Sequence, residues 1–183
     1  TVAYGSTIAA TSPDGITWTS RTLPSSSAWW SVCWSAELGL FCTVAQGSTI
    51  AATSPDGITW TSRTLPSSQV WQSVCWSAEL GLFCTVGNGS AVAATSPDGI
   101  TWTSRTSPVD NNWQAVTWSP SMSIFVAVAS SGSGNRVMVS YNAVTWSTRS
   151  TNNNNWTSIV WSKQLSVFVA VSSSGVLNRI MTS

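Results

Sequence analysis

The sequence predicts an all-β protein built from a repeated four-stranded unit, and three observations support this prediction. The stretch Thr-Ser-Pro-Asp-Gly-Ile-Thr-Trp at 11–18 returns unchanged at 53–60 and 95–102, and in altered form at 139–146. Its serine recurs at positions 12, 54, 96, 140 and 183, so the spacings are 42, 42, 44 and 43 residues. Apolar residues run contiguously or alternate, and they never recur at the three- and four-residue spacing of a helix. A period of this length with four short strands is typical of a β-propeller blade.

The clearest period contains four predicted strands, at 29–35, 40–44, 49–54 and 59–64. Short turns at 36–39 and 45–48 separate the first three strands, and Asp56-Gly57 separates the last two. Asp-Gly between two β-rich runs favours a tight hairpin, because a type I′ turn needs positive φ at both central residues and Asp and Gly tolerate it. We therefore predict such a hairpin at every copy of the motif.

Extended over the chain, this interpretation predicts a β-propeller of about five four-stranded antiparallel blades with 18 strands, in which the first and last blades are incomplete. A β-solenoid is the alternative, although its coils are usually shorter. Because Thr1 and Ser183 both fall inside a repeat, we expect further sequence or a second copy to complete the arc, unless the blades close on themselves. We predict one repeat domain, 1–183, with blades at 1–22 (partial), 29–64, 71–106, 113–150 and 156–183 (partial).

Charge is scarce, which excludes several classes of partner. The 183 residues include seven basic and six acidic side chains and no histidine, and the net charge is +1. Such a surface offers no basic patch for nucleic acid and no field to steer a charged substrate. No apolar run of about 18 residues is present, so no membrane insertion is expected. Solubility based on hydroxyl and amide groups suits an extracellular protein or one on a virion surface.

The recurring motif resembles that of a known repeat family. Ser12, Asp14, Gly15 and Trp18 are similar to the Asp-box hairpin of sialidase-type propellers, although Gly follows Asp directly here. The fuller unit, Trp-x-Ser-Val-x-Trp-Ser, then Gly-Leu-Phe, then Ser-x-Asp-Gly-x-x-Trp, resembles repeats of uncharacterised bacterial and phage-encoded propellers, some on tail fibres or cell surfaces. The resemblance implies an architecture and a setting, and it implies no particular activity.

Sialidases of this fold use an arginine cluster, a Tyr/Glu pair and an acid, and the sequence does not supply this set. Arg21, Arg63, Arg105 and Arg149 occupy one equivalent position of successive repeats and cannot converge on one ligand. The acidic residues lie a repeat apart, so no pair of carboxylates at glycosidase spacing is identifiable. We therefore expect no catalytic residue, no metal site and no cofactor. A degenerate glycoside hydrolase is the least favoured alternative.

The four cysteines occur as two pairs, nine residues apart within each repeat. A hairpin around 36–39 places Cys33 opposite Cys42, and the next hairpin places Cys75 opposite Cys84. The equivalent positions of the last repeat are Val160 and Val169. Both small core residues and cross-strand disulfides are compatible with this pattern.

Twelve of the 13 tryptophans fill three repeat positions and are therefore expected to be scaffold, whereas Trp30 stands alone. Periods 1–42 and 43–84 differ at only four positions, Tyr4/Gln46, Ser27/Gln69, Ala28/Val70 and Trp30/Gln72. These positions lie in or beside the two connections expected at one end of the blades, and the turns at the other end are identical. Together with two amide-rich loops, they give the predicted ligand-binding residues, which are Tyr4, Trp30, Gln46, Gln72, Asn111, Asn112, Asn153 and Asn154.

Because aromatic rings stack on sugars and amides bond hydroxyl groups, we expect the partner to be a neutral glycan or a surface protein. The sequence thus predicts a non-enzymatic attachment module. The alternative is a purely structural, self-associating module of a fibre or particle.

Overall fold

The structure is a computed structural model that describes residues 1–183, and every strand pairing in it is antiparallel. No helix that could cross a membrane is present. The strands are β1 (Ser6–Thr11), β2 (Thr19–Ser35), β3 (Leu40–Ser54), β4 (Thr61–Ser77), β5 (Leu82–Asn88), β6 (Val92–Ser96), β7 (Thr103–Thr106), β8 (Trp113–Ser119), β9 (Ile124–Ala129), β10 (Val137–Ser140), β11 (Ser147–Arg149), β12 (Trp156–Ser162), β13 (Val167–Ser172) and β14 (Ile180–Thr182).

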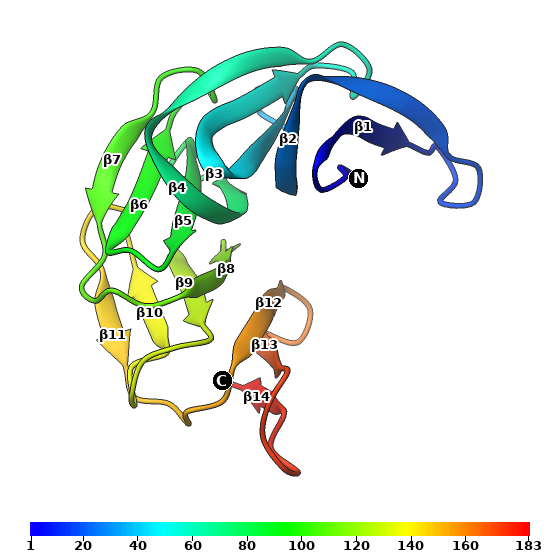
Figure 1. The fold of residues 1–183 in the computed structure, drawn as a ribbon. Helices are drawn as coiled ribbons and strands as arrows, with labels where there is room; N and C mark the ends of the chain where they lie inside the picture. The colour runs from blue at the N-terminus through cyan, green and yellow to red at the C-terminus, as the bar shows by residue number, and fades with distance from the viewer.

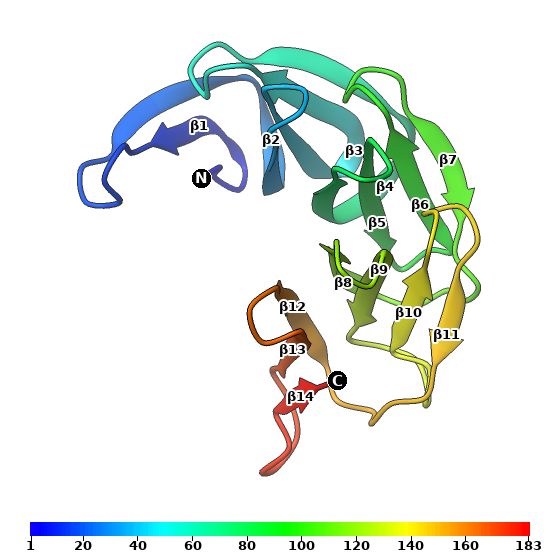
Figure 2. The same ribbon diagram turned by 180° about the vertical axis from the view of Figure 1, so that it is seen from behind.

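The strands form blades that stand side by side in an open arc (Figures 1 and 2). Blade 1 contains β1 and the start of β2, and blade 2 contains the rest of β2, β3 and the start of β4. Blade 3 continues from β4 to β7, blade 4 is the sheet β8–β11, and blade 5 is the three-stranded sheet β12–β14. Strands β8 and β12 lie toward the inside of the arc, and β7 and β11 lie on its outside (Figure 1). Blades 1 and 5 form its two ends.

The structure has 14 strands where the sequence predicts 18. Three strands, β2, β3 and β4, each run through two predicted strands, because linker residues also pair: Ser27 lies opposite Ser6, and Val70 lies opposite both Gln46 and Asn88. The first predicted strand is reduced to a single bridge between Val2 and Ala9. Apart from that strand and the merged linkers, the strands follow the predicted order.

The Asp-Gly motif forms a wider loop than the predicted hairpin. Thr11 pairs with Thr19, so seven residues, 12–18, form the connection, and only Gly15 has positive φ. Ser12 Oγ accepts a hydrogen bond from the Gly15 amide at 2.8 Å, and Asp14 Oδ1 accepts bonds from the amides of Ile16 and Thr17, both at 2.8 Å. These side-chain bonds take the place of ladder bonds, which explains why the short turn does not form.

The same bonds hold the aspartates ionised. The amides of Thr17 and Ile16 and the Ser12 hydroxyl lower the pKa of Asp14 from 3.8 to about 2. The pKa of Asp56 is lowered chiefly by the amide of Thr59. Partial burial raises the pKa of Asp98, but the bonds from Thr101 and Ile100 outweigh it and the net direction is downward.

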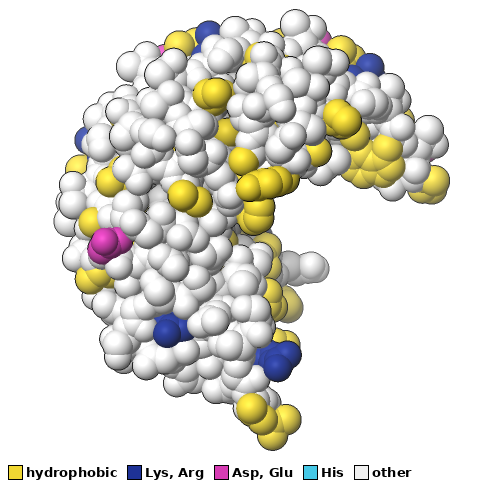
Figure 3. Space-filling view, in the orientation of Figure 1, with side chains coloured by type: hydrophobic (Ala, Val, Ile, Leu, Met, Phe, Trp, Pro, Cys, Tyr) yellow, Lys and Arg dark blue, Asp and Glu magenta, His cyan; other side chains and the backbone are white.

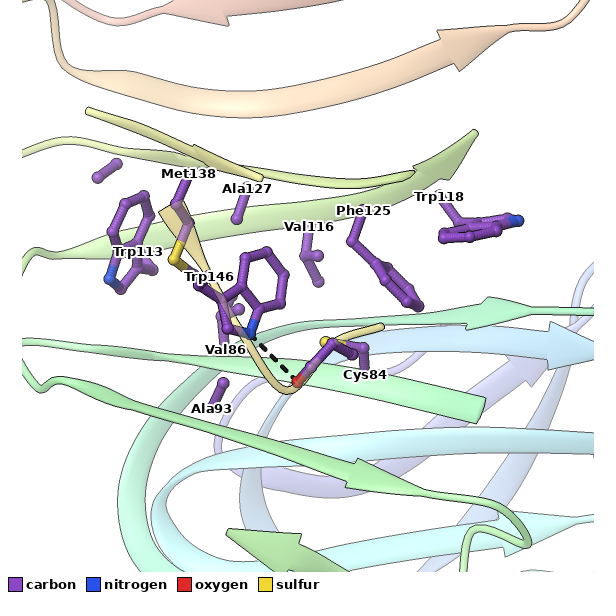
Figure 4. Packing of buried hydrophobic residues seen from close by; sticks show 12 residues of the cluster. Cys84, Val86, Ala93, Trp113, Val116, Trp118, Phe125, Ala127, Met138 and Trp146 are labelled. Atoms are coloured by element: carbon purple, nitrogen blue, oxygen red, sulfur yellow. Dashed lines mark hydrogen bonds between the residues drawn. The ribbon is translucent and has the colours of Figure 1, made fainter. Parts of the chain in front are cut away.

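Tryptophan rings take part in every cluster that packs the blades together. At the start of each inner strand one tryptophan is almost fully buried, and its Nε1 donates to the carbonyl four residues earlier; these are Trp29, Trp71, Trp113 and Trp156. In the loops, Trp102 and Trp146 are buried against the preceding blade, whereas Trp18 in blade 1 is 54% exposed. Figure 4 shows the largest cluster, in which Trp146 lies among residues of β5, β6 and β8–β10.

Blades 2, 3 and 4 each also carry a phenylalanine between two tryptophans. Phe41 lies 4.4 Å from Trp34 and 6.4 Å from Trp60, measured between ring centroids. The same arrangement of rings recurs in blades 3 and 4, where Phe83 and Phe125 each have two tryptophan neighbours. Blade 5 departs from this pattern, because Phe168 has only Trp161, at 4.5 Å.

The cysteines are free thiols, so the structure favours core residues over disulfides. Cys33 lies opposite Cys42 and Cys75 opposite Cys84, as their spacing predicts. Burial raises the pKa of Cys42 and of Cys84 to about 12, and it raises the pKa of Cys33 and Cys75 as well.

Candidate functional site

The candidate site begins with a β-bulge at the start of each inner strand. Trp29 pairs with Ala45 and Ser31 pairs with Val44, so Trp30 has no residue of its own opposite it. A bulge of this kind turns one side chain away from the pleat. Trp29 is therefore 1% exposed, while the adjacent Trp30 is 50% exposed. The bulge recurs beside Trp71, Trp113 and Trp156, so Gln72, Gln114 and Thr157 occupy the equivalent backbone position.

The bulge residue meets the turn of the preceding blade. Tyr4 lies in the turn before β1, next to Gly5, whose φ is +66°. Its ring packs edge-on against Trp30, with a centroid distance of 5.8 Å and an interplanar angle of 81°. Tyr4 is 67% exposed, so the two rings form an accessible aromatic pair.

The second copy of the site replaces this aromatic pair with an amide pair. Gln46 Nε2 donates to Gln72 Oε1 at 2.8 Å. Gln46 is half-buried and Gln72 is buried. The structure thus brings the four predicted residues together in two matched pairs, aromatic with aromatic and amide with amide, at successive blade junctions.

The predicted residues of the third junction are engaged within the protein. Asn111 is buried, and its Nδ2 donates to the carbonyl of Asn135 at 3.0 Å and to its Oδ1 at 3.2 Å. The amide of Asn112 donates to Ser131 Oγ at 2.7 Å. The Asn111 side chain also fills the space in front of Gly132. A Cβ atom added at Gly132 would lie 2.5 Å from Asn111 Nδ2. Asn111 therefore anchors the long loop between β9 and β10.

The fourth junction repeats this arrangement. Asn154 is buried and donates to the carbonyl of Asn178, as Asn111 does to Asn135. Asn153 is exposed, and its Oδ1 accepts a 2.6 Å bond from the amide of Gly134 in blade 4. The Asn153 side chain thus connects blades 4 and 5. Tyr4 and Trp30 are the two predicted site residues that expose aromatic surface, while Trp18, Trp34 and Tyr141 are exposed elsewhere on the protein.

Sequence reasoning missed a polar contact between blades. Trp76 Nε1 donates to Glu37 Oε2 at 2.6 Å, and Trp118 Nε1 donates to Glu79 Oε2 at the same distance. Glutamate is absent from the equivalent position of blade 4, which is Ser121, and Trp161 Nε1 is buried without a partner. The sequence did contain a signal for this contact. Each repeat that carries the glutamate, at 37 or 79, is followed by a repeat that carries the tryptophan, at 76 or 118.

The arginines that follow the motif form hydrogen bonds within their own blades. Nε of Arg21, Arg63 and Arg105 donates to Oγ1 of Thr11, Thr53 and Thr95 respectively, at 2.9–3.0 Å. These guanidinium groups therefore stay in their own blades. No three His, Cys, Asp or Glu side chains gather into a group that could hold a metal ion. Figure 3 shows the resulting surface, on which charged side chains are few and scattered.

The chain matches no family model and no curated protein sequence. It is similar in structure to virginiamycin B lyase from Staphylococcus aureus, with a TM-score of 0.74 and 11% identity over 97% of this chain and 63% of that one. YCF48 from Cyanidioschyzon merolae gives a TM-score of 0.66 and 19% identity over 88% of this chain and 54% of the other. A chain of a nidogen/laminin complex gives a TM-score of 0.71 and 7% identity over 85% of this chain and 61% of that one.

The chain therefore spans about three-fifths of the length of these solved structures. At such identities the likeness is one of fold. The antiparallel four-stranded units, the arc and these neighbours together identify the fold as that of a β-propeller.

Proposed function

We propose that this protein is a non-enzymatic binding module that recognises a neutral glycan or another surface through the loops at the Tyr4–Trp30 junction. The observation that carries the proposal is the exposed pair itself. Two aromatic rings in contact, 67% and 50% exposed, leave apolar ring surface in water. Tyr and Trp provide large contact areas and lose little conformational entropy on binding, which is why they are common in binding surfaces.

The chemistry around the pair favours an uncharged partner. Residues 1–13 and 22–36, which include both loops, contain no Asp, Glu, Lys or Arg. Ring faces stack on the apolar faces of sugars, and the hydroxyl groups of Ser and Tyr exchange hydrogen bonds with sugar hydroxyls. The arginines that a sialidase would direct at a carboxylate are bonded to threonines of their own blades.

An extracellular or virion-surface setting is part of the proposal. A surface that depends on hydroxyl and amide groups for solubility supports it, as does the resemblance of the repeat to those of surface and tail-fibre propellers. The similarity to a chain of a nidogen/laminin complex supports a role in meeting another protein. A protein surface is therefore the second kind of partner that the test must include.

The repeats supply a matched pair of variants for the test. Tyr4→Gln with Trp30→Gln installs the amide pair that blade junction 2 already carries, so the fold is preserved while the aromatic surface is removed. Gln46→Tyr with Gln72→Trp makes the reciprocal change. On a glycan array, and on immobilised extracellular-matrix proteins, we expect the first variant to lose binding and the second to strengthen it.

Trp30→Ala alone should weaken binding by about 1–3 kcal/mol, the contribution of one buried aromatic side chain. Binding should survive an increase in salt, because screening acts on exposed charges and hardly on stacking. If the wild type and the Tyr4→Gln/Trp30→Gln variant bound the same ligand equally, the aromatic pair would not be the site.

A further inference from the structure

The third repeat carries an Asn-Gly dipeptide in the turn between β5 and β6. Asn88 occupies the position that is Tyr4 in the first repeat and Gln46 in the second. All three residues precede a glycine, and the φ of these glycines lies between +64° and +69°. Among the asparagines of the chain, only Asn88 is followed directly by glycine. The dipeptide therefore stands at a position that belongs to the candidate site in the two earlier repeats.

No hydrogen bond holds the Asn88 side chain, in contrast to that of its counterpart. Gln46 Nε2 donates to Gln72 Oε1 at 2.8 Å. The equivalent of Gln72 in the next blade is Gln114, whose Nε2 donates instead to Ser130 Oγ at 2.9 Å. Asn88 is also one methylene group shorter than Gln46, and it is only half-buried. Its side-chain amide is therefore free to turn toward the following peptide bond.

The backbone nitrogen that follows Asn88 is free as well. Gly89 lies outside the strand ladder, because β5 ends at Asn88 and β6 begins at Val92. Gly89 is exposed, and a Cβ atom added to it would meet only Asn112 Oδ1, at 3.6 Å. The glycine has no side chain of its own, so nothing shields its nitrogen from Asn88 Cγ. Water also reaches the turn.

The three Asp-Gly dipeptides contain the same kind of atoms, but the structure holds them apart. The Gly15 amide donates to Ser12 Oγ at 2.8 Å, and the other two glycine amides donate to the equivalent serines at the same distance. Each aspartate Oδ1 accepts two further amide bonds, and such bonds lower the pKa of Asp14 to about 2. An ionised carboxylate is a poor electrophile. Among these dipeptides, Asn88-Gly89 alone leaves both reacting groups free.

We propose that Asn88 is a site of spontaneous deamidation, with the Gly89 nitrogen as the nucleophile. This nitrogen attacks Asn88 Cγ, the new C–N bond closes a five-membered succinimide ring, and the Cγ–Nδ2 bond breaks. The proton lost from the Gly89 nitrogen leaves with the Nδ2 amino group as ammonia. Water then adds to one of the two ring carbonyls and opens the ring, which gives aspartate or isoaspartate at position 88. Both reacting groups belong to adjacent residues, so the attack is intramolecular and needs no enzyme.

The reaction changes the charge at one blade junction. One acidic group joins the six already present, so the formal net charge falls from +1 to 0. Asn88 lies opposite Val70 and forms a bridge with Asn112, which places the new carboxylate between blades 3 and 4. An anion then stands at the position that is uncharged in the two earlier repeats. The Tyr4–Trp30 site takes no part in this chemistry, so either proposal can fail without the other.

The test is to incubate the purified chain at about pH 8 and to follow its peptides by mass spectrometry. Digestion with pepsin in acid avoids deamidation during preparation. We expect the peptide that contains Asn88 to give two products, each with an amide NH replaced by oxygen, while the peptide that contains Gln46 stays unchanged. Isoelectric focusing should show a new band on the acidic side of the starting protein, whose pI is about 7.6.

The second repeat supplies the matched control. Asn88→Gln installs the residue that precedes Gly47, and its side chain would have to close a larger and less favourable ring. This variant should lose the acidic band, and Asn88→Asp should focus with that band from the start. Protein unfolded in urea should convert Asn88 no faster than the native protein does. An acidic band that persists in Asn88→Gln, or conversion of Asn88 only in urea, would overturn the proposal.

Discussion

Glu37 in blade 2 accepts a 2.6 Å hydrogen bond from the indole Nε1 of Trp76 in blade 3, 39 residues later in the chain. Glu79 and Trp118 repeat the contact between blades 3 and 4. The blade 4–5 junction lacks it, because Ser121 stands in place of the glutamate. This junction also lacks the serine whose Oγ accepts from the Val74 and Val116 amides at earlier junctions, since Ala115 replaces Ser31 and Ser73.

Removal of one of these carboxylates should loosen its blade junction. Glu79→Ala leaves Trp118 Nε1, on a ring that is 7% exposed, without an acceptor. We expect a loss of about 1–2 kcal/mol in the free energy of unfolding, the usual cost of leaving a buried donor unpaired. Urea denaturation followed by tryptophan fluorescence measures it. Ser121→Ala, at the equivalent position of the next blade, is the control and should change nothing.

Restoring the missing contact should have the opposite effect. Ser121→Glu places a carboxylate where Glu37 and Glu79 stand, within reach of Trp161 Nε1, which is buried and unpaired. The expected gain is about 1 kcal/mol. Ser121→Gln tests whether the charge contributes to this stabilisation. If Ser121→Glu still stabilised a variant that also carries Trp161→Phe, the gain would not come from a bond to the indole, and this mechanism would be refuted.

Acid should weaken the Asp-Gly loops. The pKa of Asp14 is lowered from 3.8 to about 2, and those of Asp56 and Asp98 are lowered too, so the folded chain binds these protons less readily than the unfolded chain. Their stabilisation is therefore present above about pH 4 and is lost as the pH falls toward 2. Blade 4 supplies the matched variant, because Asn142 Oδ1 accepts the same two amide bonds at 2.9 and 2.8 Å.

In the triple variant Asp14→Asn, Asp56→Asn and Asp98→Asn, the thermal midpoint should fall less between pH 4 and pH 2 than in the wild type. Equal slopes for the two proteins would show that these carboxylates do not control acid unfolding.

The cysteines should behave as inert core residues. Cys42 and Cys84 are buried, and burial raises their pKa from 9.0 to about 12. Native protein at pH 8 should therefore resist thiol reagents, and all four thiols should react after unfolding. Because the folded pKa is the higher one, this stabilisation is complete below pH 9 and is lost as the pH rises toward 12.

Cys33→Val with Cys42→Val reproduces the valine pair of blade 5, where Val160 lies opposite Val169. The double variant should cost under about 1.5 kcal/mol. A loss of several kcal/mol under non-reducing conditions would instead reveal a stabilising disulfide.

The loop glycines should differ in how well they tolerate a methyl group. Gly15 and Gly99 have the same backbone, with φ of +75° and +71°. An added Cβ meets nothing at Gly15, but at Gly99 it would lie 2.9 Å from Thr53 Cγ2 of the preceding blade. Gly15→Ala should cost about 1 kcal/mol for the left-handed backbone alone. Gly99→Ala should cost at least about 1 kcal/mol more through overpacking, and equal melting curves would show that the blades do not press together there.

Much of the fold was predictable because it depends on neighbours close in sequence. The pairing of Cys33 with Cys42 follows from the hairpin between them, and the burial of Trp71 follows from its recurrence in every repeat. The seven-residue loop at Asp14 was not predicted, because the Ser12 and Asp14 side chains compete with the backbone ladder for the same amides. In the site, Tyr4 and Trp30 were identified as variable residues, but their contact was not.

By itself, the sequence determined the all-β class, the repeat, the register of the hairpins that pair the cysteines, and the residues that vary between near-identical periods. All of these depend on interactions within one period, where chain connectivity brings the residues together. Only the tertiary structure decided which blade junction lacks a Glu–Trp bond, that Asn111 and Asn154 are buried anchors, and that Tyr4 contacts Trp30. These features arise between blades, where the outcome depends on whether a neighbouring repeat supplies the matching side chain.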